Sequence, residues 1–187
     1  MDPAGQSPEE MYSVWALPPE PARDRLGSIM AGLRAAHGGP AFDPHATVVG
    51  AIRLCRSAAI EALRAAAAGV RPYTARVAGV ARGDFFYQCV YLLFEPTPEV
   101  MKASDHCCGH FGHQRSTPYM PHVSLLYGDL TDEEKEVARK RVEEMDKEIC
   151  AMQFEISKLA LCRTDIPRTK AWGHGNWWRP TTLRGSD

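Results

Sequence analysis

Two segments of the sequence place a histidine and a hydroxyl-bearing residue two positions apart, each directly after a proline. They are residues 44–47, Pro-His-Ala-Thr, and residues 121–124, Pro-His-Val-Ser. Apolar and β-branched residues surround both segments, which favours β-strands, and side chains two apart in a strand point to the same face. Each segment is therefore expected to present an imidazole and a hydroxyl on one side of a strand, with the two strands face to face across a cleft.

These residue types suit proton transfer at a phosphate. Imidazoles of His45 and His122 can act as general base and general acid, because the unperturbed pKa of histidine allows both roles near neutral pH. The hydroxyls of Thr47 and Ser124 can donate hydrogen bonds to anionic oxygens as charge shifts in a transition state. No carboxylate cluster or glycine-rich phosphate loop accompanies the segments, so the sequence predicts neither a Mg²⁺ site nor a cofactor.

The recurrence of the segment strengthens this interpretation, because a single histidine on a strand is more often an ordinary structural residue than a catalyst. The histidines lie 77 residues apart, and the same offset superposes Pro19 on Pro96 and Pro44 on Pro121. It also superposes the strands and helices predicted in the two halves. The sequence thus indicates an internal duplication.

Each half is predicted to contain strand, helix, strand, helix, strand, from alternating or helical spacing of apolar residues. A turn is expected at Gly83-Asp84, and Thr131 with Glu134 predicts a capping box at the start of the last helix. Predicted strands are residues 11–17, the strands of His45 and His122, 73–82, 85–94 and 152–162; predicted helices are 20–36, 57–68, 96–110 and 131–149.

We therefore expect a single α+β domain over residues 1–187, with two lobes that each have a mostly antiparallel sheet and outer helices around a cleft. The internal repeats cover about residues 11–83 and 85–163. Residues 166–187 form an atypical tail, because residues 166–180 carry prolines, glycines, basic groups and three tryptophans without a strand pattern. That tail is expected to be loosely ordered or differently docked.

The composition of the chain limits the classes of partner that it is expected to bind. Apolar residues make up 44% and charged residues 24% of the chain, as in soluble globular proteins. The net charge is −1, so no global field attracts extended nucleic acid or an anionic membrane. The N-terminal residues are polar and acidic without an apolar signal core, so we expect a cytoplasmic protein, and a monomer. Six cysteines without a C-x-x-C pair are expected to be mostly small buried residues.

One motif favours a different kind of site. His106 and His110 are four residues apart and could share a helical face with Cys107, Cys108 or His113 nearby, as in a Zn²⁺ site. Gly109 and Gly112 weaken a helix there, and no second cysteine pair completes the set. A polar helix end and loop over the cleft is the preferred interpretation, and no metal is assigned.

The two His-x-Thr/Ser segments resemble the paired signatures of the two-histidine phosphoesterase superfamily. Residues 12–18, 86–90, 117–122 and 159–165 are similar to the plant-type cyclic phosphodiesterases, so the resemblance covers about residues 11–165. It implies a bilobal α+β fold and hydrolysis of ADP-ribose 1″,2″-cyclic phosphate to ADP-ribose 1″-phosphate, downstream of tRNA splicing. It also implies opening of nucleoside 2′,3′-cyclic phosphates to 2′-phosphates.

The resemblance implies residue roles as well. His45 and His122 are the catalytic pair, with His122 as base and His45 as acid by analogy, although the sequence alone does not order them. Thr47 and Ser124 bind the phosphate. Tyr127 is expected to border the cleft. Trp15 and Tyr87 are candidates to pack on the ribose or base, with ordinary core packing as the alternative for all three aromatic residues.

Three other functions stay open from the sequence. The first is an RNA-end-processing enzyme of the same superfamily, against which the near-neutral charge argues. The second is a catalytically silent nucleotide-binding module, which turnover would exclude. The third is a zinc protein built on residues 106–113.

Overall fold

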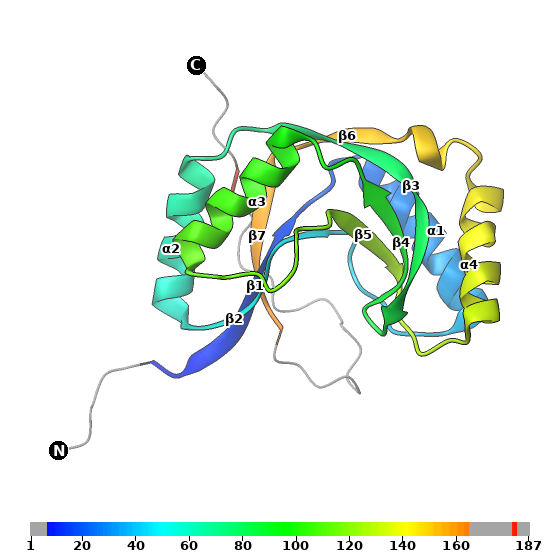
Figure 1. Cartoon of the computed structure of the whole chain (residues 1–187), viewed down its shortest axis with the longest axis horizontal. Helices are drawn as coiled ribbons and strands as arrows, with labels where there is room; N and C mark the ends of the chain where they lie inside the picture. The colour runs from blue at the N-terminus through cyan, green and yellow to red at the C-terminus, as the bar shows by residue number, and fades with distance from the viewer. Residues whose placement is uncertain (1–6, 165–180, 183–187) are drawn as a thin grey trace.

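The computed structural model describes residues 7–164 and 181–182, and the predicted order of elements is present in it (Figure 1). Regular elements are the strands β1 (Glu9–Ala16), β2 (Ala46–Cys55), β3 (Tyr73–Phe85), β4 (Gln88–Phe94), β5 (His122–Leu126), β6 (Gln153–Ile156), β7 (Lys158–Arg163) and β8 (Thr181–Thr182), the helices α1 (Ala22–His37), α2 (Arg56–Ala68), α3 (Pro98–Phe111) and α4 (Asp132–Met145), and the short 3₁₀ helix η1 (Ile149–Ala151).

The strands form one curled sheet in the order β6-β3-β4-β5-β2-β1-β7-β8, and every pairing in it is antiparallel. Its two halves meet in the middle, where β2 and β5 pair only through Ala46 and Val123. This narrow seam makes two lobes of the sheet. The predicted α+β class with two antiparallel lobes and outer helices is confirmed.

The helices cover the two lobes in pairs (Figure 1). Helices α2 and α3 pack together beside β1, β2 and β7, whereas α1 and α4 pack together beside β3, β4 and β5. Helix α1 thus lies against β5 from the second half of the chain, and α3 lies against β2 from the first half. Each lobe therefore combines elements from both halves, and the boundary between the predicted repeats is not a boundary between lobes.

Alternation along the strands separates a core face from a cleft face. On β5, Val123 and Leu125 are fully buried in the main core, so His122 and Ser124 belong to the opposite face. On β1, Val14 belongs to the same core. The alternate residue Trp15 instead joins a small separate cluster with Ala160 and Cys162 of β7. That second cluster lies on the face of the sheet opposite the main core.

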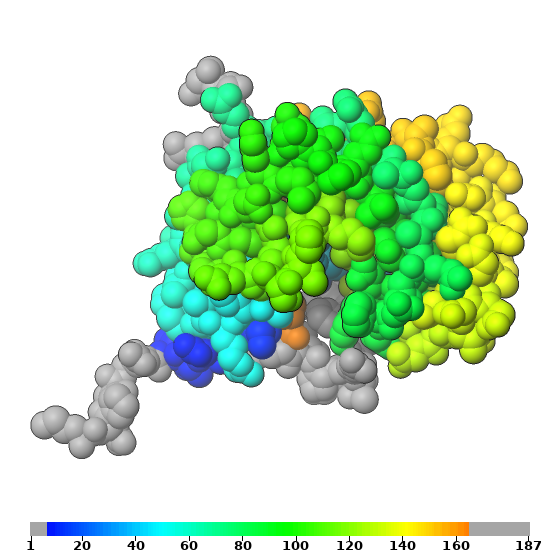
Figure 2. Space-filling view, viewed as in Figure 1, coloured from blue at the N-terminus to red at the C-terminus, as the bar shows by residue number. Residues whose placement is uncertain are grey.

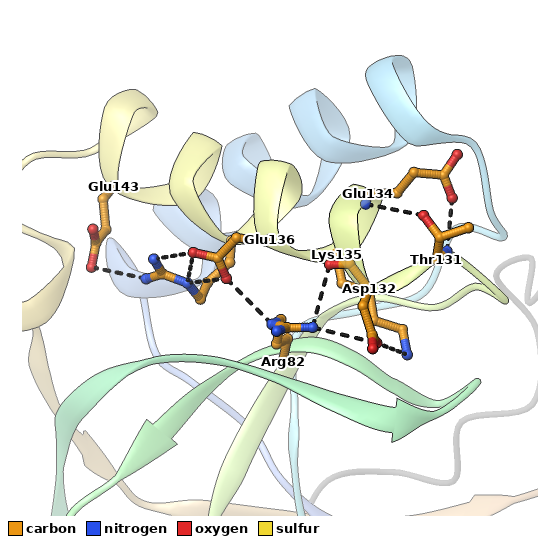
Figure 3. A network of polar contacts seen from close by, with 8 residues as sticks. Arg82, Thr131, Asp132, Glu134, Lys135, Glu136 and Glu143 are labelled. Atoms are coloured by element: carbon orange, nitrogen blue, oxygen red, sulfur yellow. Dashed lines mark hydrogen bonds and ion pairs between the residues drawn. The ribbon is translucent and has the colours of Figure 1, made fainter.

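Helix α4 begins as the sequence predicts and is held to the sheet by charge (Figure 3). The Thr131 hydroxyl accepts a hydrogen bond from the backbone N–H of Glu134, and the Glu134 carboxylate accepts one from the N–H of Thr131, which completes the capping box. Arg82 of β3 lies beneath the helix, with Nη1 3.4 Å from Asp132 and Nε 3.3 Å from Glu136. These contacts fix one outer helix against its lobe.

The predicted end of α4 was wrong. Residue 149 was expected to end the helix, but the helix ends at Met145 and Asp146 has extended backbone. The Asp146 carboxylate instead accepts hydrogen bonds from the Arg25 guanidinium of α1, one of them 2.8 Å long, and from the N–H of Glu148. The contact of Asp146 with α1 therefore outweighs the local tendency of this segment to continue the helix.

Two strand boundaries were also wrong. The turn between β3 and β4 lies at Phe86-Tyr87, since Phe85 pairs with Gln88, and Gly83 stays within β3. The single strand predicted over residues 152–162 is two strands separated by Ser157. Strand β6 pairs with β3 in one lobe, and β7 pairs with β1 in the other, so the chain crosses between lobes at this residue.

The prediction for the tail concerns residues that lie outside the described ones, except that Thr181 and Thr182 form β8 and pair with Leu159 and Lys158 of β7. No helix in the described ranges is long and apolar enough to cross a membrane.

Candidate active site

Both motif histidines lie where the two lobes meet. His45 directly precedes β2, and His122 is the first residue of β5. The pairing of Ala46 with Val123 sets an antiparallel register that places Thr47 across from His122 and His45 across from Ser124. The two strands were expected to face each other across a cleft. They lie side by side instead, and the seam brings the four side chains together on one face.

Hydrogen bonds fix the same tautomer in both histidines. Nδ1 of His45 lies 2.7 Å from the carbonyl oxygen of Asp43, and Nδ1 of His122 lies 2.8 Å from that of Met120. A carbonyl oxygen can only accept, so Nδ1 carries the proton in each ring. Nε2 is then the unprotonated nitrogen of each neutral imidazole and is available to take a proton. The proline after each acceptor holds the two-residue spacing that this contact needs.

An aromatic ring covers each histidine from the neighbouring strand. Trp15, which pairs with Thr47, stacks on His45 with ring centroids 3.4 Å apart and an interplanar angle of 7°. Tyr91, which pairs with Ser124, meets His122 edge to face with centroids 5.3 Å apart. The two half-sites are thus built alike, although the flat stack holds His45 more tightly.

Burial makes the two imidazoles unequal. His45 is only 6% exposed, and burial lowers its pKa from 6.5 to about 4, with a smaller lowering from the charge of nearby His122. Desolvation also lowers the pKa of His122, which is half-buried, while its bond to the Met120 carbonyl opposes that change. Both rings are therefore neutral in the free protein near pH 7.

The hydroxyl residues are tied to the surrounding loops. The Ser124 hydroxyl donates to the Tyr87 carbonyl in the β3–β4 turn at 2.8 Å, so it must rotate to donate to a ligand. The Tyr119 hydroxyl donates to the Thr47 carbonyl, also at 2.8 Å, and anchors the loop that leads into β5. Loop and strand thereby hold each other in register at the motif.

A cavity of about 560 Å³ opens beside this seam, where the surface is hollowed between the lobes (Figure 2). Thr47, His122 and Gln88 form its inner wall, and residues 113–120 form its outer wall. Arg115 in that outer wall is the one lining residue with a permanent charge among those described, and none of them is a carboxylate. The volume of the cavity is that of a small-molecule site, and its one permanent charge among the described residues is positive, which suits an anionic ligand.

The three predicted aromatic contacts have different surroundings. Trp15 is 6% exposed and one of its faces is occupied by His45. Tyr127 is 7% exposed and stacks on Phe42 in the main core, with centroids 3.7 Å apart. Tyr87 is 38% exposed in the β3–β4 turn and is the most accessible of the three predicted residues. Trp15 thus orders the His45 ring, and Tyr87 is the one exposed enough to meet a ligand.

Three residues near the site were not predicted from the sequence: Tyr91, Tyr119 and Arg115. Tyr91 sits within an apolar strand, and only its alternation with buried Val90 and Leu92 sets it on the cleft face. Arg115 and Tyr119 lie in a loop whose path no periodicity reports. The proline-rich spacing around Tyr119 was the available signal, since prolines on both sides hold that loop in an extended form.

Helix α3 separates the histidines of the alternative zinc motif from its cysteines. His106 and His110 of α3 have ring centroids 4.7 Å apart, but Cys107 and Cys108 are buried in the core. Within residues 7–164 and 181–182, no group of three or more His, Cys, Asp or Glu side chains is arranged to hold a metal. The described histidines and cysteines of α3 therefore belong to opposite faces of that helix.

A two-lobed antiparallel fold with a His-x-Thr/Ser pair at its seam defines the class of two-histidine phosphoesterases. The family described as the 2′-5′ RNA ligase superfamily matches residues 18–166, and the chain belongs to it. The predicted family and the prediction of an enzyme are thus confirmed.

Similar proteins agree with this membership. A cyclic phosphodiesterase of Arabidopsis thaliana is 45% identical over 157 residues, 84% of this chain and 87% of the relative. A cyclic phosphodiesterase of Triticum aestivum is 43% identical over 101 residues, 54% of this chain and 100% of the relative.

Solved structures share the fold. That of TT0787 from Thermus thermophilus has a TM-score of 0.64 at 14% identity and covers 95% of this chain and 100% of its own. The Escherichia coli LigT structure complexed with phosphate has a TM-score of 0.59 at 12% identity and covers 95% and 99%. At such low identity, these likenesses speak for the architecture alone.

Proposed function

We propose that this protein hydrolyses ADP-ribose 1″,2″-cyclic phosphate to ADP-ribose 1″-phosphate, and nucleoside 2′,3′-cyclic phosphates to 2′-phosphates, without a metal. One observation carries the proposal: each histidine donates Nδ1–H to a carbonyl and keeps Nε2 for proton transfer, beside a hydroxyl on the same face. The names of the Arabidopsis and wheat relatives support the cyclic phosphodiester as the bond that is broken.

His122 is assigned the base role because it lines the cavity and is exposed enough to meet a water molecule. Its Nε2 removes a proton from water as the oxygen attacks phosphorus. The bond from phosphorus to the 2″ oxygen (or to the 3′ oxygen of a nucleotide) breaks, and that oxygen leaves with a proton from Nε2 of His45. The product is one monoester, and the two protons balance across the step.

His45 needs a proton before it can act as the acid. Its pKa of about 4 leaves it neutral in the free protein near pH 7. An anionic phosphate against the ring favours the imidazolium and raises that pKa. Binding of substrate therefore protonates His45 and prepares it to act as the acid. The hydroxyls of Thr47 and Ser124 then donate to the non-bridging oxygens, which carry the charge in the transition state.

Phosphorus NMR with both cyclic phosphates in EDTA tests the proposal, using the wild type and the variants His45→Asn and His122→Asn. Asparagine keeps a donor close to the position of Nδ1 but cannot transfer the proton. We expect each variant to lose at least about 100-fold in kcat, the usual contribution of a general acid or base. His110→Asn, on the exposed side of α3, is the matched control and keeps full activity.

The outcomes separate the rival functions. A single monoester from both substrates, lost in both variants and retained in EDTA, supports the two-histidine mechanism. A folded wild type that binds but does not turn over either compound would identify a silent nucleotide-binding module. Faster processing of an RNA oligonucleotide with a 2′,3′-cyclic end than of either small substrate would favour an RNA-end-processing enzyme.

A further inference from the structure

The cavity beside the catalytic pair has a distal wall that the two-histidine chemistry does not use. Residues 113–120 form it, between the end of α3 and the start of β5. Thr47 and His122 line the same cavity from the catalytic side. A ligand that fills it therefore touches the reacting end and this loop at once.

Arg115 is the chemically distinctive member of that wall. Its Nη2 donates to the Ser104 hydroxyl and the Asp105 carboxylate, both at 2.8 Å, and lies 3.6 Å from the Cys108 sulfur. Among the described residues, its Nε and Nη1 take no hydrogen bond. Nη2 is thus committed to α3. Both two-pronged edges of a guanidinium include Nη2, so Nε and Nη1 remain as two separate single donors.

Several contacts hold this guanidinium relative to the catalytic motif. The buried Ser104 hydroxyl donates to the Val48 carbonyl at 2.6 Å, directly after Thr47. Arg115 also lies over the ring of Tyr119, 5.0 Å from its centroid, and the Tyr119 hydroxyl donates to the Thr47 carbonyl. Arg115 is therefore fixed through two short paths to the backbone at and directly after the motif threonine.

We propose that Arg115 is a specificity-determining residue that binds a second anionic group of the substrate, a diphosphate distal to the cyclic phosphate. This inference rests on the proposed function and predicts that a diphosphate-bearing substrate is preferred over a mononucleotide. The guanidinium keeps its positive charge, and its remaining Nη1–H or Nε–H can form a charge-assisted hydrogen bond with a phosphate oxygen. The cavity offers no described carboxylate that would repel that anion.

Asp105 sets how strongly Arg115 acts. Its side chain is 65% exposed, and it shares Nη2 of Arg115 with Ser104. It neutralises part of the positive field without entering the cavity lining. Removing its charge therefore strengthens the attraction of Arg115 for an anion, whereas removing Arg115 abolishes that attraction.

The test compares kcat/KM for ADP-ribose 1″,2″-cyclic phosphate and for adenosine 2′,3′-cyclic phosphate in Arg115→Gln, Arg115→Lys and Asp105→Asn. Arg115→Gln is expected to lose about 10- to 100-fold in kcat/KM on the diphosphate substrate, mostly in KM, and less than about 3-fold on the mononucleotide. Arg115→Lys keeps the charge but loses the fixed position of the Nε and Nη1 donors, and it is expected to fall between. Asp105→Asn is expected to equal or exceed the wild type on the diphosphate substrate.

Arg64→Gln on the exposed side of α2 is the matched control for loss of one positive charge. It should leave kcat/KM unchanged on both substrates. Equal losses on both substrates in Arg115→Gln would overturn the proposal and show that the residue only holds its loop. A loss of the same size in kcat/KM on the diphosphate substrate in Asp105→Asn would also overturn the proposal. Because the mononucleotide reports the catalytic pair independently, absence of all turnover in the wild type would instead overturn the proposed function.

Discussion

The burial of His45 has a measurable cost at low pH, which His45→Asn should remove. In the folded protein the pKa of His45 is about 4, against an ordinary value of 6.5. Well above pH 6.5 neither the folded nor the unfolded chain binds a proton at this ring, so its pKa shift does not affect stability there. Below it the unfolded chain takes up the proton first, and the folded state loses stability until the pH reaches the folded pKa.

The size of the effect follows from that interval. Each pKa unit corresponds to about 1.4 kcal/mol, so the full difference is about 3 kcal/mol, of which about 2.5 kcal/mol is lost between about pH 7.5 and about pH 4.5. Urea unfolding at both pH values gives the free energy of unfolding of wild type and variant. The variant should lose less stability on acidification than the wild type by about that amount.

The comparison cancels the other titrating groups. Asp146 and Glu136 have lowered carboxyl pKa values because they accept hydrogen bonds from Arg25 and Arg139, and they weaken the fold at low pH equally in both proteins. What differs is the contribution of His45, including its smaller coupling to His122. If the wild type and His45→Asn lose the same free energy over this interval, His45 is not held in the dry environment described above.

Three further substitutions test the packing. Trp15→Leu removes the ring stacked on His45, so NMR titration should find the His45 pKa raised toward 6.5, with kcat lowered by about 10-fold or more because the imidazole is less ordered; an unchanged titration would refute the stacking argument. Gly39→Ala should destabilise by about 1–3 kcal/mol, since φ is +97° and a Cβ would collide with the Tyr127 carbonyl. Gly109→Ala in α3 meets open space and should stabilise by about 0.5–1 kcal/mol, and thermal unfolding that ranks the two variants otherwise would contradict this account.

Features that depend on residues close together in the sequence could be predicted from the sequence. Thr131 and Glu134 satisfy each other three residues apart, so the start of α4 could be predicted. The motif residues could be assigned to one face because strand alternation is a property of the backbone itself. Their role could be proposed because histidine and hydroxyl groups recur in the same order.

Non-local contacts decided what could not be predicted. Gly83 was expected in a turn, but it is a strand residue whose Cβ would come within 2.5 Å of the Gln88 carbonyl, so glycine is required by the close approach of β4. Ser157 carries no signal that the strand changes partner there. Arg115 acquires its position from Ser104 and Tyr119, and no periodicity in its own loop encodes those contacts.

The change of partner at Ser157 has a consequence for how the chain becomes a protein. The pairs Tyr73 with Ile156 and Tyr12 with Arg163 join opposite lobes to one short segment near the end of the described chain. A polypeptide emerging from the ribosome therefore cannot complete either lobe from one half of its sequence. Both lobes are completed only when this late segment pairs with β1 and β3. Pairing strands so far apart in the sequence closes long loops, which makes folding slow and cooperative across the whole domain.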